Sequence, residues 1–149
     1  MRGPPAPILL IEDDENDVIL VRRALRRSEL DLELRVVRDG GEAIAYLQGA
    51  GAYTDRAAHP LPSLLLLDLK MPGRSGFEVL AWVRAQPALR HVPLVVLTSS
   101  RESCDVERAY EAGASSYLVK PVSFDALQSM LTVLGRYWIE LNVLPESEP

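Results

Sequence analysis

The sequence has a single cysteine, Cys104, and only two histidines, His59 and His91, among its 149 residues. One cysteine cannot form a disulfide within the chain, and neither histidine has a partner at the spacing of a metal site. The scarcity of both residue types argues against a disulfide-rich fold and against a thiolate or imidazole metal centre. A free thiol is typical of a reducing compartment.

Positive charge and long apolar runs are also scarce. Lysine and arginine number 16 against 21 aspartates and glutamates, which gives a formal net charge of -5. Such a surface repels the phosphates of nucleic acids and anionic membranes. No run approaches the roughly 20 apolar residues that cross a bilayer, and prolines interrupt residues 1–7 before the apolar core of a secretory signal can form. We expect a cytoplasmic protein that binds neither nucleic acid nor membranes.

Short aliphatic runs recur along the chain, and the hydrophobic fraction of 48% is enough for the core of a single domain. Each run is too short for a helix, and continuous apolar sequence is typical of parallel strands that are covered on both faces. The runs that predict strands are 8–11, 64–67, 94–97 and 117–119, with 34–37 as a fifth candidate.

Segments with apolar residues at helical spacing separate these runs. Helices are expected around 18–25, 40–48, 77–83 and 102–112, and a long last helix over about 123–143. The residue at the start of that last helix, Ser123, is a favourable cap. Strands that alternate with helices five times predict an α/β, flavodoxin-like (βα)5 fold, a doubly wound five-stranded parallel sheet with strand order 2-1-3-4-5. We expect one domain over 1–149, with its core at about 7–134.

Acidic residues follow two of the predicted strands. The run EDDE at 12–15 follows the first strand, and Asp68 follows the third. In the proposed sheet these carboxyl ends are adjacent, and carboxylates held together in one crevice need a cation, for which an all-oxygen set favours Mg²⁺. Two alternatives stay open. The acidic run would be a solvated turn that caps a helix, or Asp68 would only begin a turn ahead of 71–73.

Groups of complementary chemistry follow the other two strands. Thr98 and Ser99 end the fourth strand, and Lys120 and Pro121 end the fifth. A hydroxyl and an ammonium opposite an acid cluster suit a transferred phosphoryl group. Because bonds that precede proline can be cis in tight turns, a cis bond before Pro121 is one way to aim Lys120 into the crevice. Taken singly, Thr98 would be an ordinary strand-end residue and Lys120 a solvated lysine.

Four segments resemble the response-regulator receiver family of two-component signalling. They are ILLIEDDE (8–15), LLLLDLKMPGRSGFEVL (64–80), VVLTSS (95–100) and EAGASSYLVKPV (111–122). Their combination covers most of the chain and is far more specific than any one segment. The resemblance implies a receiver domain, which is a phosphoacceptor that assists its own phosphorylation and dephosphorylation and is not an enzyme with a separate substrate.

The resemblance also implies roles for single residues. Asp68 matches the phosphoacceptor, and Glu12 and Asp13 match the acidic pair that organises Mg²⁺, although many members have aspartate where Glu12 stands. The remaining matches are the Lys70 backbone carbonyl as a further metal ligand, Thr98 and Lys120 as the groups that contact the phosphoryl oxygens, Ser99 as the small residue after the threonine, and Tyr117 as the switch aromatic. In this family the aromatic ring rotates inward when the threonine moves toward the phosphoryl group. Position 70 tends to tune the phosphoryl lifetime.

Three further segments resemble the single-domain regulators that partner bacterial phytochrome histidine kinases. They are the long loop 50–63, the segment RDGGEAIAYLQG (38–49) and the final helix through RYWIELNVLP (136–145). The resemblance implies a sensor histidine kinase as the phosphoryl donor and an unidentified downstream protein as the receiver of the signal.

The last helix carries an apolar stripe that is longer than the sheet beneath it needs. Its members are Leu127, Leu131, Leu134, Trp138 and Leu141. The excess predicts a homodimer, formed through this helix or through the face of the fourth helix, fifth strand and fifth helix. The alternative is that the stripe folds back onto its own domain.

Three other functions compete with a phosphorylated receiver. A metal-dependent phosphohydrolase also uses an aspartyl nucleophile after a strand, but it would want a second acid where Lys70 stands. A flavin-binding module shares the topology, but acidic strand-end loops lack the donors that the FMN phosphate needs. A degenerate receiver would act only as an interaction module, although no residue required for phosphorylation is missing.

Overall fold

The computed structural model describes residues 6–71 and 73–145. The strands are β1 (Ile8–Ile11), β2 (Leu34–Val37), β3 (Leu64–Leu67), β4 (Leu94–Thr98) and β5 (Ser116–Val119). The α-helices are α1 (Glu15–Arg27), α2 (Gly40–Gln48), α3 (Gly76–Ala85), α4 (Ser103–Glu111) and α5 (Phe124–Gly135), and a short 3-10 helix, η2 (Pro87–Leu89), follows α3. Most of the proline-bearing N-terminal tail (1–5), and Pro72 in the turn considered for Asp68, lie outside the described residues. None of the described helices combines the length and the apolar character that a bilayer crossing requires.

The strands form one parallel sheet in the order β2-β1-β3-β4-β5. Ile8 of β1 pairs with Leu34 on one side and with Leu64 on the other. Every residue of β1 and β3 is buried. The predicted flavodoxin-like (βα)5 fold and its strand order are therefore confirmed, and the strand ends that carry acids are neighbours.

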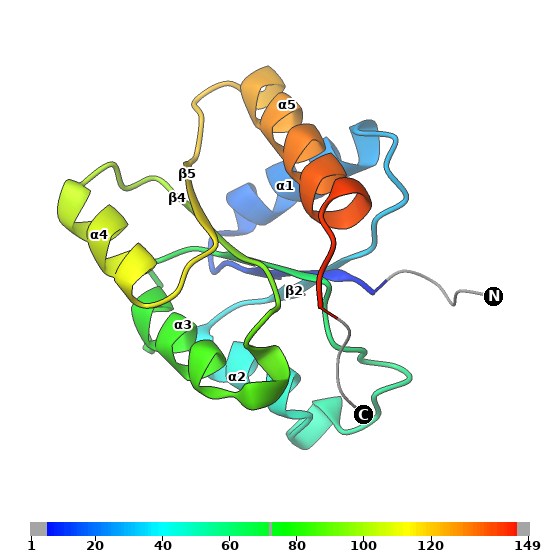
Figure 1. Cartoon of the computed structure of the whole chain (residues 1–149). Helices are drawn as coiled ribbons and strands as arrows, with labels where there is room; N and C mark the ends of the chain where they lie inside the picture. The colour runs from blue at the N-terminus through cyan, green and yellow to red at the C-terminus, as the bar shows by residue number, and fades with distance from the viewer. Residues whose placement is uncertain (1–5, 72, 146–149) are drawn as a thin grey trace.

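Helices cover both faces of this sheet (Figure 1). Because successive side chains of a strand point to opposite faces, Ile8 and Leu10 join one apolar cluster with α1 and α5, while Leu9 and Ile11 join a second cluster with α2 and α3. On the first face α1 packs against α5. This burial on both sides explains why the strands appear in the sequence as uninterrupted apolar runs.

Polar side chains cap the starts of α1 and α5. The carboxylate of Asp14 accepts hydrogen bonds from the backbone N–H groups of Asn16 and Asp17 at the start of α1. The hydroxyl of Ser123 accepts one from the N–H of Ala126 at the start of α5, so the predicted cap is confirmed. These caps satisfy N–H groups that a helix leaves without partners, and they hold the first turn of α1 at the carboxyl edge of the sheet.

The C-terminal helix differs from the prediction of one continuous helix over about 123–143. The α-helix α5 ends at Gly135, and a π-helix, η3 (Arg136–Leu141), continues it. At its end the N–H of Asn142 donates to the carbonyl of Tyr137, 2.6 Å away. This wider hydrogen bond spans five residues, and the apolar spacing of a sequence does not distinguish one π-turn from an α-turn.

The loop 50–63 is tied to α2 by one arginine. Nitrogen atoms of the Arg56 guanidinium donate to the backbone carbonyls of Tyr46 (2.7 Å) and Leu47 (2.6 Å), near the end of the helix. The loop also contains a short 3-10 helix, η1 (Gly51–Tyr53). The sequence predicted the loop but neither its helical turn nor its attachment.

Candidate functional site

The polar residues that end the strands gather at the carboxyl edge of the sheet. The N–H of Asp68 donates to the carbonyl of Ile11 (3.1 Å), which continues the pairing of β1 and β3 beyond the strands. The N–H of Lys120 donates to the carbonyl of Thr98 (2.8 Å) in the same way between β4 and β5. Backbone pairing thus fixes where each of these side chains leaves the sheet.

Three carboxylates form the acidic part of the site. Glu12, Asp13 and Asp68 each offer an oxygen, and these oxygens all lie within 4.8 Å of one another. Glu12 and Asp68 are only 1% and 8% exposed, whereas Asp13 reaches solvent. Carboxylate oxygens at this spacing repel one another, and a hard divalent cation offsets the repulsion and prefers such ligands. The structure therefore brings together the three predicted side-chain ligands in an arrangement that fits a divalent ion.

Lys120 lies at the centre of the carboxylates. Its Nζ is 2.5 Å from Oε1 of Glu12, 2.8 Å from Oδ2 of Asp17 and 3.5 Å from Oδ2 of Asp68. The lysine side chain is 16% exposed, so solvent screens these interactions only weakly. The predicted meeting of Lys120 with Asp68 is thus present, together with an ion pair to Asp17 that the sequence did not predict.

Burial and ion pairing change the pKa values of Glu12 and Lys120. Burial raises the pKa of Glu12 from an ordinary 4.5 to about 8; the hydrogen bond from Lys120 opposes this rise, and the charge of Asp68 adds to it. Burial lowers the pKa of Lys120, but its hydrogen bonds to Asp17 and Glu12 outweigh burial, so that its net pKa is raised. Burial thus favours the neutral form of Glu12, and its carboxylate partners favour the charged form of Lys120.

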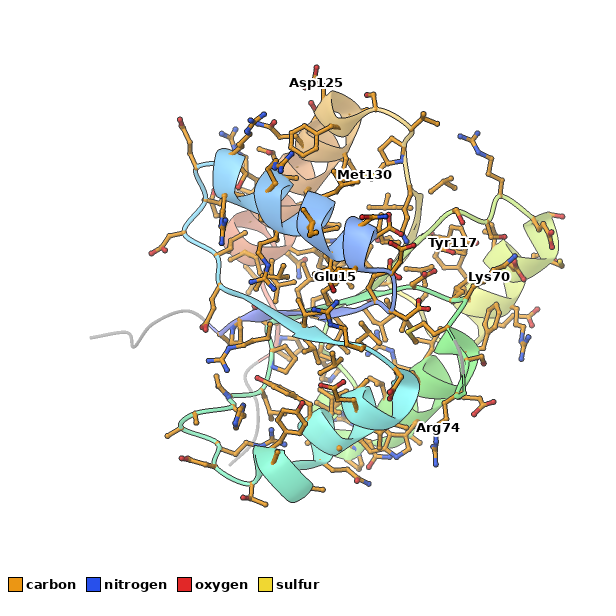
Figure 2. The ribbon with its side chains drawn as sticks, turned by 180° about the vertical axis from the view of Figure 1, so that it is seen from behind. Glu15, Lys70, Arg74, Tyr117, Asp125 and Met130 are labelled. Carbon is orange, nitrogen blue, oxygen red and sulfur yellow. The ribbon has the colours of Figure 1, made fainter. Side chains whose placement is uncertain are left out.

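Thr98 ends β4, and Lys70 follows β3, the neighbouring strand of the sheet. The side chain of Thr98, at the end of β4, is fully buried. The N–H of Lys70 donates to Oδ1 of Asp68 at 3.3 Å, which orients the carboxylate, while the Lys70 side chain is exposed. Ser99 is exposed beside Thr98. Figure 2 shows Lys70 and Tyr117 toward the same end of the molecule.

Tyr117 is half-buried and already held inward. Its hydroxyl donates to the backbone carbonyl of Ser100 at 3.0 Å, and its ring packs against the apolar cluster under α4. The hydroxyl of Ser100 in turn donates to Asp105 of α4 at 2.6 Å. Burial raises the pKa of Tyr117. The ring is thus held inward by this hydrogen bond and by its packing.

The bond between Lys120 and Pro121 is trans, because the described residues contain no cis peptide bond. The suggestion that a cis bond aims Lys120 into the crevice is therefore wrong. The hydrogen bond from the Lys120 N–H to Thr98 already fixes the end of β5, and the long lysine side chain reaches the acids from that trans backbone.

Sequence reasoning missed Gly76, which begins α3 directly against Asp68. A Cβ atom on Gly76 would lie 2.5 Å from the carbonyl oxygen of Asp68 and 2.6 Å from Cα of Leu69. Both atoms belong to the backbone and cannot rotate away. Only glycine lets α3 approach this closely, and the signal in the sequence was a glycine directly after Ser75, which caps the helix.

Comparisons with known proteins agree with this geometry. A family model described as the response regulator receiver domain matches residues 8–132. The chain belongs to that family. The response regulator Rcp1 of Synechocystis sp. is 41% identical over 143 residues, which are 96% of this chain and 95% of Rcp1.

Solved structures of response regulators share the fold over nearly their whole length. The phosphorylated cyanobacterial phytochrome response regulator RcpA is 34% identical with a TM-score of 0.87, over 95% of this chain and 99% of that one. The Mn²⁺-bound form of Rcp1 is 40% identical with a TM-score of 0.84, over 95% of this chain and 100% of that one. The chain is thus a receiver-domain response regulator, homologous to phytochrome response regulators, and its three clustered carboxylates fit a divalent ion.

Proposed function

We propose that this response regulator accepts a phosphoryl group on Asp68 with the help of Mg²⁺ and passes the signal on through protein contacts. One observation carries the proposal. A strand-end carboxylate, Asp68, is buried 3.5 Å from the ammonium of Lys120 and within 4.8 Å of two further carboxylates. Nucleophile, cation and metal ligands therefore share one pocket.

Each residue of the site has a separate role in the proposed phosphoryl transfer. An oxygen of Asp68 attacks the phosphorus of a phosphohistidine; an O–P bond forms, the P–N bond breaks, and its electron pair goes to the ring nitrogen, which takes up a proton. When bound by Glu12, Asp13 and Asp68, with the Lys70 carbonyl as a further ligand, Mg²⁺ neutralises charge on the phosphoryl oxygens. Lys120 donates to one of these oxygens. Thr98 turns its hydroxyl toward another, and the small Ser99 leaves room beside it.

The donor in this proposal is a sensor histidine kinase. The names of RcpA and its relatives associate this kind of receiver with phytochromes, and identity of 34% over 95% of this chain supports a phytochrome kinase as the partner. Because such a kinase uses ATP, we expect its kinase domain and this receiver to lie in the cytoplasm. We assign residues 1–149 to this one receiver domain.

The output depends on a two-state equilibrium at the α4-β5-α5 face. Hydrogen bonds to a charged phosphoryl group contribute roughly 1.5–3 kcal/mol each, and reversing a 1:99 equilibrium takes about 5.5 kcal/mol. Bonds from Lys120 and Thr98 approach that amount. The Tyr117 hydroxyl is bonded to the backbone of Ser100, whose own hydroxyl is bonded to Asp105 of α4. Phosphorylation would stabilise the inward position of Tyr117 and, through these two bonds, the position of α4.

A homodimer through the C-terminal helix is part of the proposal. The residues of the predicted apolar stripe differ in exposure. Leu131 is fully buried, as expected if the stripe folds onto its own domain, whereas Leu141 is 70% exposed. Val133 and Tyr137, one helical turn apart on the same exposed side, are 68% and 49% exposed. They border an apolar groove along β5, which has a neighbour on one side only. A second copy would cover this face with the same face, as two-fold symmetry requires.

Labelling with a small acyl phosphate tests the phosphoacceptor. Intact-mass spectrometry should find one added phosphoryl group on the wild type with Mg²⁺ and none after Mg²⁺ is removed by chelation. Asp68→Asn should stay unlabelled under all conditions. Equal labelling of the wild type and Asp68→Asn would overturn the assignment of Asp68, and label without a divalent ion would overturn the role of Mg²⁺.

A further inference from the structure

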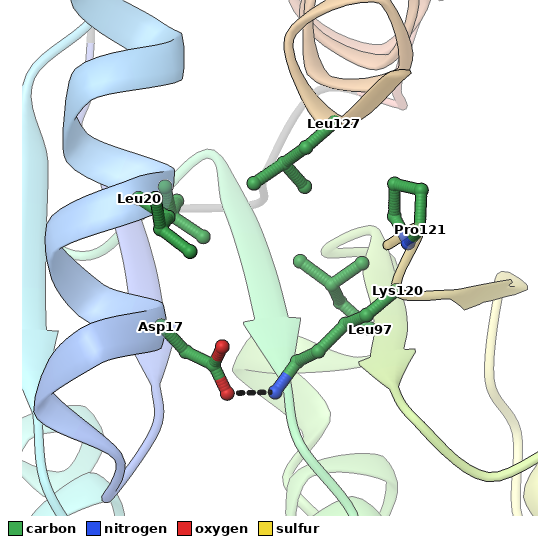
Figure 3. Close-up of a pocket in the computed structure, with 7 residues that line it drawn as sticks. Asp17, Leu20, Leu97, Lys120, Pro121 and Leu127 are labelled. Atoms are coloured by element: carbon green, nitrogen blue, oxygen red, sulfur yellow. Dashed lines mark hydrogen bonds and ion pairs between the residues drawn. The ribbon is translucent and has the colours of Figure 1, made fainter. Parts of the chain in front are cut away.

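Asp17 is a carboxylate of this pocket that the proposed phosphoryl chemistry does not use. Its Oδ2 lies 2.8 Å from Nζ of Lys120, closer than Oδ2 of Asp68 at 3.5 Å. Figure 3 shows the two side chains facing each other, Asp17 from the first turn of α1 and Lys120 from the end of β5. The ammonium therefore has a carboxylate partner on α1 that is not one of the three clustered acids.

The start of α1 fixes Asp17 in that position. Its backbone N–H donates to Oδ1 of Asp14 at 3.1 Å, so the helix cap also fixes the backbone position from which the Asp17 side chain extends. A cavity of about 40 Å³ lies beside the ion pair, between α1 and α5, and apolar atoms of Leu20, Leu97 and Leu127 line it. Both side chains of the ion pair border this cavity (Figure 3).

A phosphoryl group on Asp68 would compete with Asp17 for one cation. The ammonium of Lys120 has three N–H donors, and its neighbours are Glu12, Asp17 and Asp68. When a divalent ion takes Glu12, Asp17 is the carboxylate that still binds Lys120 from outside the metal cluster. The bond to Asp17 draws the ammonium toward α1, so a shift of Nζ toward a phosphoryl group on Asp68 lengthens that ion pair.

We propose that Asp17 is a positioning residue that holds Lys120 on the α1 side of the pocket and thereby weakens the state with a phosphoryl group on Asp68. The inference rests on the proposed function and adds to it a residue that sets the balance between the two states. Removing the Asp17 carboxylate frees Lys120, so the phosphoryl-bound state gains stability. Because the Asp17 side chain is 33% exposed, the gain is about fivefold in affinity, equivalent to about 1 kcal/mol.

Beryllium fluoride in the presence of Mg²⁺ is the probe, because its trifluoride anion mimics a phosphoryl group on a carboxylate without being turned over. We expect Asp17→Asn to lower its dissociation constant about fivefold relative to wild type, measured by ¹⁹F NMR. The matched control is Glu15→Gln. Glu15 lies in the same helical turn and carries the same charge, but it pairs with Arg38 and not with Lys120. Asp17→Glu restores the carboxylate and should return the constant toward the wild-type value.

A double-mutant cycle separates competition for Lys120 from a general effect of charge. In a Lys120→Met background, Asp17→Asn should leave the dissociation constant unchanged. An equal gain with and without Lys120, or in Glu15→Gln, would overturn the inference, as would an unchanged constant in Asp17→Asn alone. If Lys120→Met does not fold, the comparison of Asp17→Asn with Glu15→Gln and Asp17→Glu decides. Failure of the wild type itself to bind beryllium fluoride would instead count against the proposed function.

Discussion

Nζ of Lys120 lies 2.5 Å from Oε1 of Glu12, although the two residues are 108 positions apart in the chain. Glu12 follows β1 and Lys120 follows β5, and β3 and β4 lie between these strands in the sheet. The contact therefore crosses the carboxyl edge over two intervening strands.

Replacing Lys120 by methionine should destabilise the metal-free protein by about 2–3 kcal/mol, because Glu12 and Asp68 lose a charged donor in a buried place. Urea unfolding measures the loss, and added Mg²⁺ should recover part of it by supplying a new cation. Lys70→Met is the control. Lys70 is exposed next to the same carboxylate and has no ion pair among the described residues, so its change should stay within about 0.5 kcal/mol.

The contribution of Glu12 to the unfolding free energy of the metal-free protein should fall as pH rises from about 4.5 to about 8. The folded state keeps the Glu12 proton up to about pH 8, whereas the unfolded chain releases it near 4.5, so the folded state binds more protons in this window. Unfolding free energies of wild type and Glu12→Gln, compared across this range, isolate the effect, since glutamine does not titrate. A wild-type curve parallel to that of Glu12→Gln would refute it.

The same proton gives a prediction for the metal. Mg²⁺ needs the Glu12 carboxylate, so binding below pH 8 should release a proton and the affinity should rise with pH until about 8. Calorimetry in two buffers of different ionisation enthalpy counts the protons. Glu12→Gln should bind Mg²⁺ more weakly and release fewer protons.

Gly76→Ala should cost about 1–3 kcal/mol of stability and reduce acyl-phosphate labelling, because its Cβ would lie 2.5 Å from the carbonyl oxygen of Asp68 and push α3 away from the site. Gly41→Ala serves as the control. At Gly41, also in the first turn of a helix, a Cβ meets its nearest atom at 3.4 Å, so alanine should be neutral or slightly stabilising. Thermal unfolding and mass spectrometry give the two readouts.

Val133→Glu should shift the proposed dimer to monomer, because it places a charge at the centre of the exposed apolar side of α5. Ile19→Glu is the matched control, since Ile19 is 46% exposed on α1 and does not line the groove along β5. Light scattering after size exclusion reports the mass of each variant. A monomeric wild type, or equal masses for wild type and Val133→Glu, would contradict the dimer.

The sheet and most of the site could be predicted because both follow from local sequence. Runs such as 64–67 are apolar throughout since helices cover both faces, and parallel order alone brings Asp68 beside the residues that end β1. The ion pair of Asp17 could not be predicted in this way. It depends on how α1 lies relative to the end of β5, a tertiary arrangement that includes the packing of α1 against α5 and that the residue types near Asp17 do not indicate.

Other features of the structure could not be predicted from the sequence for related reasons. The Tyr117 hydroxyl donates to the backbone carbonyl of Ser100. Every residue has a backbone carbonyl, so the residue type at position 100 does not indicate this contact. The residue types before Pro121 and after Gly135 do not distinguish a trans from a cis bond, or a π-turn from an α-turn.

The place of β5 in the sheet has a consequence for local opening. It is an edge strand with one neighbour, β4, yet it delivers Lys120 to a pocket of acids. Fraying of this strand alone would withdraw the lysine and leave the carboxylates uncompensated, so amide hydrogen exchange in β5 should slow when the pocket is filled. The exchange rate of a four-residue strand would then report the occupancy of a site at its tip.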